Sequence, residues 1–224
     1  MNAQIIVEIS TVLIFILSTV LSIFLTADYL RKKNLSFLFW AAGLWAFSLA
    51  VLLEILFSAG IFSQPMIKLY LFLVAELVLM LSLGSLSLFN SRYAFYYYMY
   101  ASAVTAYVII ALLLCRVGYI ISNYVVYGPL PLQVVISSSL VTFPAAVIIV
   151  LIAAISFMKK RDKKMISIIA GVIIVSIAGT LYIASFPAFL YYAEFIGILL
   201  LWAGFFDPSI IIKNNNHLRG SHTS

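Results

Sequence analysis

Apolar residues run along this chain in long uninterrupted stretches, and short polar segments separate them. Each stretch holds about twenty residues or more, which at 1.5 Å per residue is enough to cross a hydrocarbon layer roughly 30 Å thick. Because apolar and polar residues do not alternate, the stretches predict helices and not the strands of a membrane barrel. The pattern predicts seven transmembrane helices, at about residues 5–29, 36–60, 66–89, 93–117, 134–158, 165–185 and 188–206.

Composition agrees with this pattern. Hydrophobic residues make up 65% of the chain and charged residues 9%, whereas soluble domains carry roughly 25% charged residues. Except for the segment 118–133, the connections are short, which favours antiparallel packing of neighbouring helices. We therefore expect an all-α integral membrane protein, a bundle of seven transmembrane helices over residues 1–206.

Basic residues fall at alternate ends of the apolar stretches. Because positive charge is enriched in cytoplasmic loops, this asymmetry predicts an N-terminus outside and a C-terminus in the cytoplasm. Only Lys68 and Arg116 fall on the predicted outer side. The basic residues on the predicted cytoplasmic side are Arg31, Lys32, Lys33, Arg92, Lys159, Lys160, Arg161, Lys163, Lys164, Lys213 and Arg219.

We expect different structures at the two ends of the chain. The first residues lack the basic region of a cleavable signal peptide, so we expect the first helix to be retained. Residues 207–224 form a polar tail that we expect to be cytoplasmic and disordered. The stretch Leu218–His222 leaves two interpretations open, a native end or the remnant of an expression tag.

Three glutamates interrupt the apolar stretches and are the main candidates for chemistry. With the N-terminus outside, Glu76 lies near mid-depth, Glu194 lies between mid-depth and the outer face, and Glu54 lies nearest the outer face. An ionised acid in mid-membrane costs about 2.5–3.5 kcal/mol on insertion scales. Each acid is therefore expected to stay protonated, to share a proton or to meet a cation, so we predict an ion or proton site.

Helical spacing places these acids on packing faces. Ala42, Ala46, Ala50 and Glu54 recur every four residues, a pattern of small residues that favours close helix packing. We predict that the second, third and seventh helices converge around an acidic pocket, with Lys68 and Arg116 as possible outer charge partners. The alternative is that each glutamate is protonated and hydrogen-bonds a neighbouring helix as a structural contact.

Two other features have structural interpretations first. Pro144 lies inside the fifth apolar stretch and predicts a kink or hinge, with nearby serine and threonine hydroxyls available to the freed carbonyl group. The tyrosine cluster at 93–100, Trp40 and Trp202 are typical of residues that anchor a helix at the membrane surface.

Several classes of protein are excluded by what the sequence lacks. Both histidines, His217 and His222, lie in the tail, so the sequence offers no histidine-based haem or metal site within the membrane. Every lysine lies at a predicted boundary or in a loop, so no lysine is available for a retinal Schiff base within the membrane. The sequence also has no phosphate-binding loop, which excludes ATP hydrolysis by that kind of site. We expect no cofactor, no metal and no enzymatic activity, except that two carboxyl groups alone can perform acid–base chemistry.

Three functions fit these observations. The first is a component of a transport or translocation system in the cell membrane, linked to protons or cations through the glutamates and working with partner subunits. The second is a seven-helix sensory or interaction module with an outward-facing pocket. The third is an assembly subunit of a larger membrane complex. No sequence feature points to nucleic acid, since the net charge of +6 comes from the basic loops.

Overall fold

The computed structural model describes residues 3–88, 92–118, 121–122, 125–126, 130–160, 167, 170–171, 174 and 187–205. Its helices are α1 (Ala3–Lys32), α2 (Leu35–Ser58), α3 (Gln64–Leu86), α4 (Arg92–Leu114), α5 (Leu132–Lys160) and α7 (Pro187–Phe205). The two-residue strands β1 (Ile121–Ser122) and β2 (Val125–Val126) pair antiparallel between α4 and α5. Most of the predicted helix at 165–185 and the tail 207–224 lie outside the described residues.

The helices match the expected membrane architecture in part. Within the described ranges, α1 to α5 are each long and apolar enough to cross a membrane. The apolar part of α7, Tyr192–Ala203, is shorter. Many large apolar side chains are exposed, among them Leu114 at 77% and Phe143 at 72%, as expected where lipid and not water surrounds the bundle. The chain is therefore compatible with a multi-pass membrane protein.

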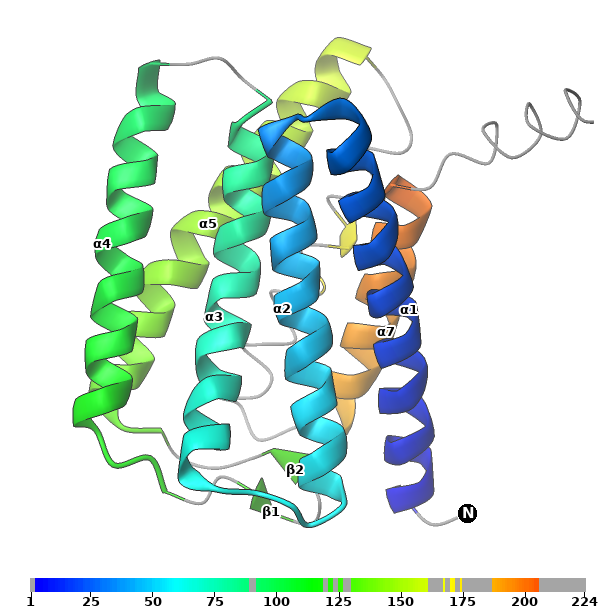
Figure 1. Ribbon diagram of the computed structural model, residues 1–224, viewed down its shortest axis with the longest axis vertical. Helices are drawn as coiled ribbons and strands as arrows, with labels where there is room; N and C mark the ends of the chain where they lie inside the picture. Colours follow the sequence, from blue (N-terminus) through cyan, green and yellow to red (C-terminus); the bar gives the residue numbers. More distant parts are fainter. Residues whose placement is uncertain are drawn as a thin grey trace, which may run out of the picture.

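Consecutive helices run in alternating directions, as Figure 1 shows from α1 to α5. Helix α2 packs against both α1 and α3, helix α5 packs against α3 and α4, and α7 packs beside α1. The junctions between α1 and α2 and between α3 and α4 lie at the same end of the bundle as the end of α5 (Figure 1). This end holds Arg31–Lys33, Arg92 and Lys159–Lys160, whereas Arg161, Lys163 and Lys164 lie outside the described residues.

Local chemistry sets the helix boundaries. Lys33 has a φ of 51° and turns the chain between α1 and α2. The side chain of Asn34 then caps α2 by accepting a hydrogen bond from the backbone N–H of Ser36 at 2.9 Å. Gly60, with a φ of 80°, follows α2 because a glycine adopts this conformation without strain. Pro65 occupies the first turn of α3, where its missing N–H has no partner to lose.

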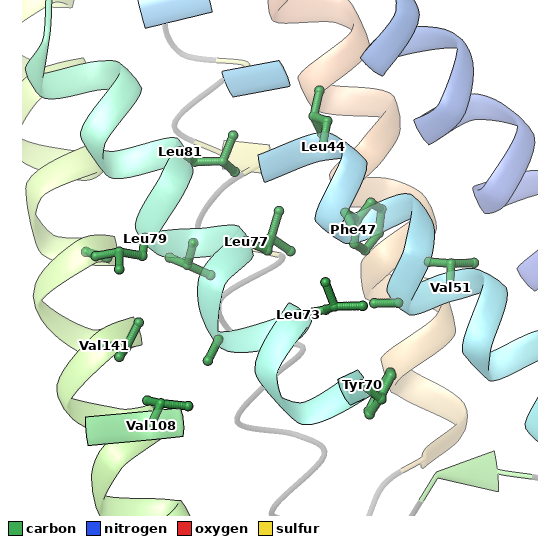
Figure 2. Packing of buried hydrophobic residues seen from close by; sticks show 14 of the residues in the cluster. Leu44, Phe47, Val51, Tyr70, Leu73, Leu77, Leu79, Leu81, Val108 and Val141 are labelled. Carbon is green, nitrogen blue, oxygen red and sulfur yellow. The ribbon is translucent and has the colours of Figure 1, made fainter. Parts of the chain in front are cut away.

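Small residues allow α2 and α3 to approach closely, but they are not all the residues that the sequence pattern predicted. Ala50 is buried, whereas Ala42 is exposed, so the predicted alanine face is wrong at that end. The contact is made at Gly43 instead, where an added Cβ would lie 3.2 Å from the Leu77 carbonyl oxygen. Leu73, Leu77 and Leu81 fill the space between α3 and α2, while Leu79 lies near Val141 of α5 (Figure 2).

The two tryptophans predicted as surface anchors take part in contacts between helices. The indole N–H of Trp40 donates to Ser85 Oγ at 3.4 Å, and its ring covers Gly84 of α3. The indole N–H of Trp202 donates to the Leu17 carbonyl oxygen at 2.9 Å and joins α7 to α1. These bonds hold the helices that carry the acids in fixed relation to their neighbours.

Candidate functional site: a buried carboxyl pair

Two of the predicted acids come together inside the bundle. Glu54 lies near the end of α2 and is 3% exposed, and Glu194 lies in α7 and is 8% exposed. Their carboxyl groups are close enough for the charges to interact. The hydroxyl of Tyr70, from α3, donates a hydrogen bond to Glu54 Oε1 at 2.6 Å. The site therefore combines residues of the consecutive helices α2 and α3 with a residue of α7, which is far from both in the sequence.

The hydrogen-bonding tyrosine is held by packing. Tyr70 lies on the side of α3 that faces α2 (Figure 2) and is 4% exposed. Its ring meets the ring of Phe57 edge-on, with 5.9 Å between centroids. Because Phe57 is also buried and follows Glu54 by one helical turn, the contact positions the tyrosine hydroxyl against the acid.

Each acid of the pair keeps one buried oxygen without a partner. Within the part of the chain that the structure describes, Glu54 Oε2 and Glu194 Oε2 make no hydrogen bond. A buried polar atom in that condition carries a free-energy penalty of about 1–3 kcal/mol. In addition, two ionised carboxylates close together in a low dielectric repel each other. The arrangement therefore calls for a proton or a cation at the pair.

The pair offers few ligands to a metal ion. Among the described residues, no three histidine, cysteine or acidic side chains come together in a way that would hold one. Calcium takes six to eight oxygen ligands and magnesium takes six in octahedral geometry. Glu54 and Glu194 have four carboxyl oxygens between them, which is fewer than either set.

Glu76 lies apart from this pair. It is 4% exposed and accepts a hydrogen bond from the Thr105 hydroxyl of α4 at 2.7 Å. Its Oε2 atom also has no partner among the residues described. No contact joins it to Glu54 or Glu194 in the described ranges, so the three acids form one pair and one separate site. Of the three predicted acids, Glu54 and Glu194 interact electrostatically, and the third helix meets Glu54 through Tyr70 and not through Glu76.

Pro144 lies inside α5, and its freed carbonyl has a partner that the sequence did not reveal. Because proline has no N–H, the carbonyl of Leu140, four residues earlier, lacks its intrahelical bond. The Tyr100 hydroxyl of α4 donates to that oxygen at 2.6 Å. The nearby hydroxyls that were expected to fill this role bond elsewhere, since Thr142 donates to the Ser138 carbonyl at 3.0 Å.

Part of the tyrosine cluster joins helices instead of facing outward. The hydroxyls of Tyr97 and Ser82 are 2.7 Å apart and connect α4 to α3. Tyr98 stacks on Phe39 of α2, with 5.9 Å between ring centroids. Tyr96, in contrast, is 70% exposed, as expected of a surface anchor. Tyr97 and Tyr100 are three residues apart and stack on each other, but Tyr98 directly follows Tyr97, so spacing alone does not separate the two groups.

The two cations of the opposite end make no described ion pair with an acid. The Lys68 ammonium group donates to the Leu113 carbonyl oxygen at 3.5 Å, and Arg116 is exposed. The ion pair that is present among the described side chains joins Lys32 to Asp28, at 3.1 Å and near the surface. The geometry therefore does not support Lys68 or Arg116 as charge partners of the glutamates.

Comparison with known protein families, with curated proteins and with solved structures finds no match to this chain.

Proposed function

We propose that this chain is a membrane-embedded component of a transport or translocation system, and that the pair of Glu54 and Glu194 binds the proton or cation that drives or accompanies transport. The observation that carries this proposal is the pair itself. Two acids from different helices lie within electrostatic range of each other, and each has a buried oxygen without a partner. An intramembrane acid that is only a structural contact gains from full hydrogen bonding, which these two lack.

The proposal includes a topology. Seven transmembrane helices with the N-terminus outside fit the alternating direction of the helices and the basic residues at one end of the bundle. In this orientation Glu54 and Tyr70 lie near the outer end of their helices. The pair is then closer to the outer face than to the cytoplasm. The cell membrane and additional subunits belong to the same proposal, since the sequence contains no phosphate-binding loop for ATP as an energy source.

The test is ion flux through the purified full-length chain in liposomes, followed with a pH-sensitive dye or a cation-sensitive dye. The wild-type protein should carry protons or cations, and Glu54→Gln and Glu194→Gln should reduce the rate to that of empty liposomes. Vesicles prepared from cells that express the chain provide a second assay in which partner subunits are present.

The matched control is Ser48→Ala. Ser48 is a buried polar residue of α2 whose hydroxyl bonds Ser18 of α1 at 2.9 Å, away from the pair. This variant should keep the wild-type rate, because a bond between helices in a membrane contributes about 0.6 kcal/mol. Normal flux in both glutamine variants would overturn the proposal. Stabilisation by a ligand without any flux would favour the sensory module instead.

A further inference from the structure

We propose that the turn between α1 and α2 is a binding site for the headgroup of an anionic phospholipid. Three consecutive cations, Arg31, Lys32 and Lys33, occupy this turn, and all three side chains are exposed. Figure 1 shows the turn at the end of the bundle where α4 begins and α5 ends. The inference is independent of the proposed transport, because it uses none of the buried acids.

The length of the turn sets the depth of these cations. Helix α1 ends at Lys32 and α2 begins at Leu35, so only two residues connect them. Both helices are long and apolar enough to span a membrane. A connection this short cannot extend far from the hydrocarbon layer, so the cations lie at the level of the lipid headgroups. At that depth, positive side chains are attracted to anionic lipids of the adjacent leaflet.

The turn has more positive charge than its own acid neutralises. The Lys32 ammonium group lies 3.1 Å from a carboxylate oxygen of Asp28, one helical turn earlier. Among the described side chains, no carboxylate pairs with Arg31 or Lys33. A guanidinium group can donate two parallel hydrogen bonds to a phosphate, and an ammonium group beside it adds a second positive charge. The turn therefore offers a phosphate two cations that are not already paired.

Aromatic rings hold both lysines at the turn. Lys32 Nζ lies 4.5 Å from the centroid of the Phe37 ring, and Lys33 Nζ lies 5.8 Å from the centroid of the Tyr29 ring. The negative face of a ring attracts a cation without removing its charge. The ammonium groups are therefore restrained before a lipid binds, which reduces the entropy that binding costs.

The backbone of Lys33 is in a conformation that does not favour lysine. Its φ of 51° lies in the left-handed region, where the residue after a helix is usually glycine or asparagine. The Lys33 N–H donates to the Tyr29 carbonyl oxygen at 2.7 Å, a bond that any residue except proline can make. The turn itself therefore does not require a lysine side chain, and binding of an anion gives its charge a role.

Exposed apolar side chains continue from the turn along the junction of α1 and α2. The indole N–H of Trp45 donates to the Thr26 hydroxyl at 3.2 Å, which identifies the faces that meet there. Leu30 follows Thr26 by one helical turn, and Leu38 precedes Trp45 by two turns. Both leucines are exposed. An acyl chain can lie on this surface while its phosphate meets the cations, so a phospholipid fits better than a water-soluble anion.

Native mass spectrometry of the full-length chain in neutral detergent tests the site. The chain is titrated with phosphatidylglycerol or with phosphatidylcholine of the same acyl chains, and we expect it to retain phosphatidylglycerol preferentially. Arg31→Gln and Lys33→Gly should each lower the affinity for phosphatidylglycerol roughly fivefold. Arg116→Gln is the matched control, because it removes an exposed arginine at the opposite end of the bundle and should leave the affinity unchanged.

Lys33→Gly also separates lipid binding from folding. Because glycine adopts the left-handed conformation without strain, the Tm of this variant in phosphatidylcholine should not fall below that of the wild type. Its affinity for phosphatidylglycerol should fall nevertheless. A lower Tm would show that the lysine side chain stabilises the turn, and would overturn its assignment to the lipid.

Three other results would overturn the proposal. Equal retention of the two lipids would show that the site does not select an anionic headgroup. An equal loss of affinity in Arg31→Gln and Arg116→Gln would show that only the net charge of the chain matters. Displacement of the lipid by an equal concentration of glycerol 3-phosphate or of polyglutamate would assign the cations to a soluble phosphate or to an acidic protein segment.

Discussion

Two polar sites lie on opposite sides of α3. They differ in whether another residue donates a hydrogen bond to the oxygen that lacks its usual partner. On the α4 and α5 side, Pro144 leaves the Leu140 carbonyl without its intrahelical bond, and Tyr100 supplies a replacement at 2.6 Å. On the side of α2 and α7, Glu54 and Glu194 each keep a buried oxygen for which no described residue supplies a partner. The first arrangement is complete within the protein, and the second leaves room for a proton. We therefore interpret the first as a structural site and propose the second as the functional one.

The comparison also explains why Glu76 is not simply a third member of the site. Like the pair, it has a buried oxygen without a described partner, but no second acid faces it and Thr105 supplies one hydrogen bond. A single neutral carboxyl group can remain at such a place with a modest penalty. Two buried acids whose charges interact oppose each other's ionisation, and on the proposed function this would make the pair responsive to protons.

The largest change in the free energy of unfolding is expected at the carboxyl pair, where stability and flux should change in opposite directions. Replacing Glu194 with methionine removes a buried oxygen without a partner and keeps a similar side-chain volume. We expect the free energy of unfolding to rise by about 1–3 kcal/mol while flux is lost. Reversible unfolding in mixed lipid and detergent micelles measures the change. Leu199→Met, at an exposed position of the same helix, is the control. A loss of stability of similar size would mean that Glu194 is a structural contact.

At the proline site, we expect a substitution to lower the free energy of unfolding and not to raise it. Tyr100→Phe removes the donor to the Leu140 carbonyl and should lower the free energy of unfolding by about 0.6–2 kcal/mol. Adding Pro144→Ala restores an N–H that can bond this carbonyl, so the loss should be smaller in the double variant. Tyr107→Phe, on the exposed part of α4, is the control. An equal loss with and without Pro144 would show that Tyr100 does not act through that carbonyl.

The sequence predicted the helices well and the contacts of their polar residues less well. Uninterrupted apolar stretches are sufficient to place α1 to α5, because a membrane helix must be apolar along its length. The burial of Glu54, Glu76 and Glu194 also follows from the penalty of exposing an acid to lipid. Which acids meet depends on helix rotation and crossing, which the apolar pattern does not encode.

Particular residues show this limit. Tyr70 was not identified from the sequence, because a single tyrosine in an apolar helix resembles any packing residue. Its spacing of six from Glu76 places the two on different faces of α3, which was the available signal. Similarly, the spacing of Ala42 and Ala50 could not reveal that Gly43 is the position where α3 approaches.

The smallest effect is expected at Glu76. Thr105→Val keeps the shape of the side chain and removes the hydroxyl that bonds Glu76 Oε1, so the free energy of unfolding should fall by about 0.6 kcal/mol. Thr105→Ser, which keeps the hydroxyl, is the matched control and should lose less.

The proton flux of Thr105→Val tests whether Glu76 lies on the same proton path as Glu54 and Glu194. If the pair of Glu54 and Glu194 is the proton site, Thr105→Val should carry protons at nearly the wild-type rate, because its hydroxyl contacts neither acid of the pair. A rate as low as that of Glu194→Gln would instead place Glu76 on the same path. The two sides of α3 would then belong to one proton route that crosses the helix, and the contrast between a structural side and a functional side would no longer hold.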